Sequence, residues 1–384
     1  MWNHPRVAET AGADRTSATQ NPQYNSLQAL RAVAALMVVF YHLGGPGGFE
    51  SKIGGEPTLT SWAYPIGALG VDLFFIISGF IMTVTTARLS PGPGSARSFL
   101  LRRIARVYPA YVVITAAIFL VHLWRPELIN SNEEIPPNII ASFLLLPQEG
   151  LPLLLVGWTL VYEMYFYLIF AACLLLSRRL LVAALGLWGA ATVVLHQFVT
   201  ADSGPYLQVV GNLQNIEFLL GVGVALMVMS RRAVSSWLLL LTGATLFATT
   251  CVVTMRTGHL TDDWLHLVGF GGGLALILYS VVRAEVAGRW GTPAPLIALG
   301  DASYSLYLVH VPILKVVAIV AVAVLPAGSA LHVVCVLAAL VLTVVGAWTY
   351  YLLVERPLFH LFGRRSAARR VGARALPPRQ RADA

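Results

Sequence analysis

Residues 26–43 read SLQALRAVAALMVVFYHL, an apolar run interrupted by few polar side chains. A helix of this length measures about 27 Å, close to the roughly 30 Å of a bilayer's hydrocarbon core. Comparable apolar runs recur along the 384-residue chain, in which 57% of residues are hydrophobic and 11% charged. Soluble domains carry about 25% charged residues, so this chain has too few to cover a soluble surface. The sequence predicts an all-α, polytopic transmembrane helical bundle.

About ten spanning helices are predicted from the apolar segments. They run over residues 26–43, 65–86, 104–124, 151–176, 180–199, 216–229, 234–253, 265–282, 293–322 and 330–359. The apolar stretch 135–146 is too short to span and is expected to be re-entrant or interfacial. We expect one transmembrane domain over residues 26–360, between a polar tail (1–25) and a basic tail (361–384). The first tail has no apolar core, so no cleavable signal peptide is expected.

The distribution of basic residues predicts the orientation of the bundle. With the N-terminus inside, 20 of the 26 Lys and Arg residues fall in cytoplasmic segments and three in outer loops. This bias follows the positive-inside rule and predicts that both termini are cytoplasmic, in a bacterial inner membrane. The basic C-terminal tail is therefore expected to face lipid headgroups rather than nucleic acid. The three cysteines fall inside predicted helices and are expected to be apolar packing residues.

The first helix carries two ionisable residues, Arg31 and His42. Such residues are costly in a membrane and are functional-site candidates. Because they are eleven residues apart, their side chains project within about 20° of each other around the helix and roughly 16 Å apart along its axis. Histidine is suited to general-base work near neutral pH. The alternatives are that Arg31 reaches the headgroups and that His42 bonds to another helix.

Two of the acidic residues within predicted spans are also functional-site candidates. Glu163 sits among aromatic residues in WTLVYEMYFYL (158–168), where a carboxylate needs a cation or imidazole partner. His42 and Arg31 are the candidates, and a purely structural ion pair is the alternative. Asp72 lies near the start of GVDLFFIISGFIM (70–82) and is expected to contact substrate or to complement the helix dipole. In the same helix, Ser78 and Gly79 predict close helix packing.

Polar residues also follow a helical period in DASYSLYLVH (301–310). Ser303, Tyr307 and His310 share one face, which predicts either a polar cavity lining or bonds between helices. Lys315 is expected to pair with a neighbour. The ionisable residues without such a pattern are expected to be structural: His196, Glu217 and His332.

The segment RRIARVYP (102–109) places three arginines at the cytoplasmic end of the third predicted helix. Arginine suits phosphate recognition because its planar guanidinium offers a fork of donors. The segment therefore predicts a basic entrance for an anionic donor substrate. The alternative is that these arginines only fix the orientation of the helix in the membrane.

Together these segments resemble the integral-membrane acyltransferase-3 family over roughly residues 25–360. Arg31 and His42 match its Arg–ten residues–His signature. GVDLFFIISGF, RRIARVYP and SYSLYLVH are similar to three further family motifs, in order. WTLVYEMYFY looks closest to the branch that O-acetylates exopolysaccharides.

The resemblance implies transfer of an acyl group, usually acetyl, from cytoplasmic acyl-CoA to a sugar hydroxyl of an exopolysaccharide or other envelope glycan. It implies that His42 is catalytic and that Arg31 is its companion; we add Glu163 as a carboxylate that polarises His42. No metal is expected. The residues expected to bind acetyl-CoA are Arg102, Arg103, Arg106 and Tyr108. Those expected to contact the acceptor are Asp72, Trp158, Tyr307 and His310.

Two alternatives remain from the sequence. Other members of the family acylate small glycosylated metabolites such as macrolide antibiotics, which would change the acceptor. A transporter or flippase of a lipid-linked sugar would instead use the buried ions as a proton relay. The chain has no inverted repeat to support this second class.

Overall fold

The computed structural model describes residues 24–45, 47–54, 60, 64–129, 135–230, 235–257, 263–324 and 331–362. The regular elements in these residues are helices, without a strand, which confirms the all-α prediction. The predicted tails lie outside the described residues, apart from residues 24–25 and 361–362.

Ten long helices form the bundle in the described part of the chain. They are α1 (Asn25–Gly44), α4 (Gly70–Thr86), α5 (Pro93–Trp124), α7 (Gly157–Cys173), α8 (Arg178–His196), α10 (Gln214–Met229), α11 (Ser236–Thr257), α13 (Gly272–Val286), α15 (Ser303–Val324) and α16 (His332–Tyr350). Among the described residues, eight helical stretches are long and apolar enough to cross a membrane, while α4 and α7 are shorter apolar helices. The chain is a multi-pass membrane protein.

Short elements connect the long helices. They are α2 (Phe49–Lys52), α3 (Tyr64–Gly67), η1 (Pro126–Leu128), α6 (Ile139–Leu144), α9 (Pro205–Val210), α12 (Asp263–Leu265), α14 (Ala294–Asp301) and two π-helical turns, η2 (His266–Gly271) and η3 (Tyr351–Glu355). The α6 helix is only six residues long, in keeping with the prediction that this stretch does not span.

Some predicted helix boundaries were wrong. The α5 helix begins at Pro93 rather than at residue 104, because hydropathy falls at the arginines whereas backbone hydrogen bonding continues through them. The segment 293–322 is two helices, α14 and α15, with a turn at Ala302. Likewise α3 and α4 are separate, and residues 151–156 precede α7 without being helical.

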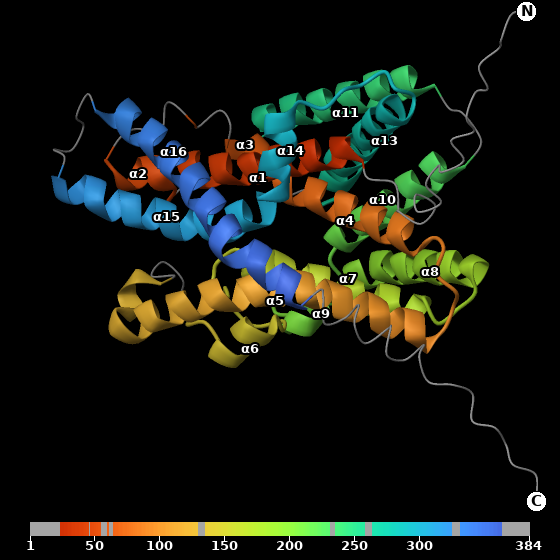
Figure 1. Cartoon of the computed structure of the whole chain (residues 1–384), viewed down its shortest axis with the longest axis horizontal. Coiled ribbons are helices and arrows are strands. Elements are labelled where there is room, and N and C mark those ends of the chain that lie inside the picture. Colours follow the sequence, from red (N-terminus) through yellow and green to blue (C-terminus); the bar gives the residue numbers. More distant parts are fainter. Residues whose placement is uncertain are drawn as a thin grey trace, which may run out of the picture.

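The α1 helix lies at the centre of the bundle, in contact with α4, α14 and α15. Figure 1 shows α16 crossing the molecule diagonally between α15 and α5. It packs on α15, and the hydroxyl of Tyr350 at its end donates a hydrogen bond to the carbonyl oxygen of Ala110 in α5. The position of α1 is fixed partly by Glu285 of α13, which accepts hydrogen bonds from the backbone N–H groups of Asn25 and Ser26 at 2.7 and 3.1 Å. These bonds satisfy N–H groups that the first turn of a helix leaves without partners.

The α4 and α10 helices cross at two glycines. A Cβ atom on Gly79 would lie 1.9 Å from the carbonyl oxygen of Phe218, and one on Gly221 would lie 1.9 Å from that of Ile76. Only residues without a side chain allow this backbone approach. The predicted packing role of Gly79 is confirmed.

We expect Gly79→Ala and Gly221→Ala to destabilise the protein by about 1–3 kcal/mol or more, because backbone atoms must move apart. The measurement is the Tm of the detergent-purified protein. Gly223→Ala on the same α10 helix is the control, since no atom lies within 4 Å of its added Cβ. Equal Tm values for all three variants would contradict the close crossing.

Candidate active site

Two cavities lie against each other inside the bundle. The arginine cavity has a volume of about 280 Å³ and is lined by Arg31, Arg103, Arg106 and Glu163, among others. The histidine cavity is larger, about 890 Å³, and includes His42 in its lining. Val71 and Tyr307 line both cavities. The first helix thus presents Arg31 to one cavity and His42 to the other.

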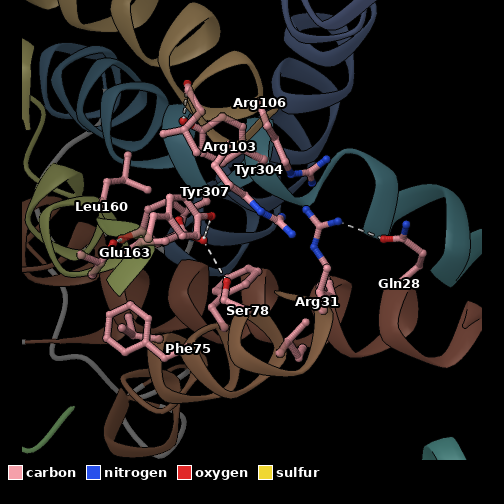
Figure 2. A pocket seen from close by; sticks show the side chains of 17 residues that line it. Gln28, Arg31, Phe75, Ser78, Arg103, Arg106, Leu160, Glu163, Tyr304 and Tyr307 are labelled. Carbon is pink, nitrogen blue, oxygen red and sulfur yellow. Dashed lines mark hydrogen bonds between the residues drawn. The ribbon is translucent and has the colours of Figure 1, made fainter. Parts of the chain in front are cut away.

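Three guanidinium groups converge in the arginine cavity. Figure 2 shows Arg31 of α1 and Arg103 and Arg106 of α5 turned toward one another. Arg31 donates a hydrogen bond to Gln28 at 3.1 Å, and Arg103 lies 5.4 Å above the ring of Phe99. In the described part of the chain, none of the three arginines has a carboxylate within ion-pair distance. The cavity therefore carries an excess of positive charge that suits an anionic ligand.

Glu163 is the carboxylate of the arginine cavity. It accepts hydrogen bonds from the hydroxyl groups of Ser78 at 2.8 Å and Tyr167 at 2.5 Å, and Figure 2 shows the first of these. The structure thus gives Glu163 hydroxyl partners and a place in the arginine cavity, while His42 lines the other one. The role of Ser78 was missed, because its partner is 85 residues away in the chain.

Two of the residues predicted to bind acetyl-CoA lie outside both cavities. Arg102 is exposed and donates a hydrogen bond to the hydroxyl of Ser98 at 2.5 Å. The hydroxyl of Tyr108 donates to the carbonyl oxygen of Leu144 at 2.7 Å, which joins α5 to α6. At about 100° per residue, Arg102 lies about 40° around α5 from Arg106 and about 100° from Arg103, at the exposed edge of the face that carries them.

His42 stacks on His310 across the α1–α15 contact. Their ring centroids lie 5.0 Å apart with 20° between the planes. His310 is fully buried and its Nδ1 lies 3.1 Å from the carbonyl oxygen of Leu306, so Nδ1 carries the proton that this bond requires. Its Nε2 is then an acceptor, and it is buried without a partner in the structure. An acceptor nitrogen is thereby held beside the His42 ring.

Tyr307 forms part of the wall between the two cavities. Its hydroxyl lies 2.9 Å from the carbonyl oxygen of Val156 and 2.6 Å from the hydroxyl of Thr159. Its ring contacts Phe74, with centroids 5.8 Å apart. Trp158, which was predicted to contact the acceptor substrate, also lines the histidine cavity and so shares it with His42.

Asp72 lines the histidine cavity and is paired with a residue that the sequence did not single out. Its Oδ2 lies 3.0 Å from Nε2 of His266. Glu217, expected to be structural, lies beside this pair. The other two residues that were expected to be structural form ion pairs: His196 with Asp263 at 3.4 Å and His332 with Glu50 at 3.0 Å. Lys315 lines the histidine cavity.

Over residues 24–352 the chain matches the acyltransferase-3 family, described as an acyltransferase domain. The chain belongs to this family. No solved structure matches this acyltransferase.

Several curated relatives are similar to this acyltransferase over most of its length. The exopolysaccharide production protein ExoZ of Rhizobium meliloti is 31% identical over 82% of the chain and 95% of its own length. The acyltransferase MdmB of Streptomyces mycarofaciens is 28% identical over 76% of the chain and 79% of its own length. The putative peptidoglycan O-acetyltransferase YrhL of Bacillus subtilis is 28% identical over 77% of the chain, which spans about half of that protein.

Proposed function

We propose that this acyltransferase moves an acetyl group from cytoplasmic acetyl-CoA to a sugar hydroxyl of an exopolysaccharide or another envelope glycan. The names of ExoZ and YrhL support a glycan acceptor and O-acetylation. The observation that carries the proposal is the contact between a cationic cavity and a histidine-lined cavity at Val71 and Tyr307. A donor held in the first cavity needs to pass only this wall to reach an acceptor in the second.

The arginine cavity is the proposed donor site. Its volume of about 280 Å³ lies just below the roughly 300–1,000 Å³ of small-molecule sites, so it suits one segment of a coenzyme. Arg31, Arg103 and Arg106 would bind the anionic groups of CoA through charge-assisted hydrogen bonds. The predicted positive-inside orientation would put this cavity on the cytoplasmic side, where acyl-CoA is available.

The histidine cavity is the proposed acceptor site. Its larger volume of about 890 Å³ suits a sugar unit, and Trp158 offers the flat apolar surface on which a sugar ring can pack. His42 would remove the proton of the acceptor hydroxyl as its oxygen attacks the thioester carbonyl. Collapse of the tetrahedral adduct breaks the C–S bond, and the leaving thiolate takes the proton back from His42. An acyl-His intermediate is the other sequence of steps.

Glu163 and His310 take proposed roles that follow from their contacts. Glu163 accepts hydrogen bonds from Ser78 and Tyr167. We therefore assign it the role of positioning side chains in the arginine cavity rather than that of polarising His42. His310 stacks on His42 and offers a buried acceptor nitrogen, so we assign it the positioning of the His42 ring.

Labelled acetyl-CoA tests the reaction class with the purified protein. We expect label to appear in added envelope glycan, and mass spectrometry should find fewer O-acetyl groups on surface glycans of cells that lack the gene. Label in a glycosylated small metabolite alone would overturn the glycan acceptor. Accumulation of an unmodified lipid-linked sugar in vesicles, without label transfer, would overturn the enzyme class in favour of a transporter.

A further inference from the structure

Three ionisable side chains meet beside the histidine cavity without a role in the proposed reaction. Asp72 of α4, Glu217 of α10 and His266 of η2 each offer one ligand atom, and these atoms lie within 4.8 Å of one another. Asp72 and Glu217 are each only 1% exposed. The cluster thus brings two buried carboxyl groups and an imidazole to one point.

The two carboxyl groups of this cluster are only partly satisfied by the protein. Oδ1 of Asp72 and Oε2 of Glu217 are buried and have no hydrogen-bond partner in the structure. The two carboxyl groups approach each other, with one oxygen of each within 4.8 Å of the other. Neither forms an ion pair with lysine or arginine among the described residues. Two carboxylates in this setting repel each other, and a cation bound between them relieves the repulsion, as would a proton shared by them.

The cluster is also open to a ligand. Asp72 and His266 line the histidine cavity, so an ion can enter from it. His266 is the first residue of a π-helical turn, a rare geometry that re-aims side chains and occurs often at functional sites. This turn brings Nε2 of His266 to 3.0 Å from Asp72.

We propose that Asp72, Glu217 and His266 bind one divalent transition-metal ion of the Zn²⁺ or Mn²⁺ class. Two carboxylates with a neutral imidazole balance the double charge of such an ion, and this mixture of oxygen and nitrogen ligands suits first-row metals. Three protein ligands leave coordination positions open toward the cavity, as in catalytic metal sites. Acceptor hydroxyls would fill these positions; that role rests on the proposed function, whereas the metal site itself does not.

Metal binding is measured on the full chain in nanodiscs, stripped with a chelator and titrated with Zn²⁺ or Mn²⁺ in equilibrium dialysis. We expect one ion per chain, and at least about tenfold weaker binding in Glu217→Gln and Asp72→Asn, since even outer-shell changes cost 10–100-fold. His266→Gln provides a third variant if one carboxylate variant does not fold, as judged by its Tm.

Glu50→Gln is the matched control for this experiment. Glu50 also pairs with a histidine at 3.0 Å, but its other oxygen accepts hydrogen bonds from Thr60, so no third ligand or free oxygen remains. Glu50→Gln should bind metal as the wild type does. Absence of specific binding in the wild type would overturn the proposal, in favour of a proton shared by the two carboxyl groups. So would equal affinity in the wild type and the folded cluster variants. Because the readout is metal bound, loss of the proposed acetylation would not mimic either result.

Discussion

His42→Ala should lower acyl transfer at least about 100-fold while leaving a folded, membrane-inserted protein, because general-base catalysis typically contributes 10²–10⁴-fold. His42 lines the histidine cavity, so its loss removes the proposed base from the acceptor site. The helix should persist, since alanine favours helical structure. The measurement is the initial rate of label transfer from acetyl-CoA at equal amounts of folded protein.

The matched control for this prediction is His360→Ala. His360 is exposed and lines neither cavity, so its replacement should leave the rate unchanged. If His310 acts only through His42, the double variant His42→Ala/His310→Ala should be no slower than His42→Ala, because residues that act as a unit are not additive. A wild-type rate for His42→Ala would remove His42 from the mechanism.

Reversing the charge of Arg103 and Arg106 together should weaken CoA binding by at least about 100-fold. A hydrogen bond to a charged group contributes about 1.5–3 kcal/mol, and 1.4 kcal/mol corresponds to a tenfold change in Kd. The double variant Arg103→Glu/Arg106→Glu removes two such donors and adds repulsion toward phosphate. Affinity for CoA is measured by calorimetry, and KM for acetyl-CoA should rise in parallel.

Arg102→Glu supplies the control on the same helix. Arg102 is exposed, bonds to Ser98 and lies outside the arginine cavity, so its reversal should change CoA affinity much less. Arg103→Gln is a milder test, because it removes the charge of Arg103 without reversing it where this side chain also packs on Phe99. Equal losses in the Arg102 and double variants would show only a general effect of basic charge. Unchanged CoA affinity in the double variant would contradict the donor site.

The sequence by itself determined the class of this protein and much of its helix content. Apolar runs and few charges predict spanning helices because in lipid each helix must satisfy its own backbone hydrogen bonds. The predicted span 26–43 agrees with α1 to within one residue at each end. Predicted helix boundaries were wrong where backbone hydrogen bonding continues beyond the apolar segment, as at the start of α5.

Part of the site was also within reach of the sequence. The spacing of Arg103 and Arg106 places them on one face of a helix. Arg102, four residues before Arg106, lies near that face too, so its place outside the cavity was decided by the tertiary structure. Arg31 and His42 lie on one stripe of α1, as predicted. That they serve two different cavities was not predictable, because the wall between them is built by Tyr307 from another helix.

Only the tertiary structure decided which side chains meet. Ser78 and Glu163 are 85 residues apart in the chain, and Asp72 and His266 are 194 apart. Such contacts depend on the rotation and crossing of whole helices, which the α4–α10 glycine contact and the π-helical turn at His266 help to set. Helical periodicity fixes the face on which a residue lies, but the packing of neighbouring helices determines what that face meets.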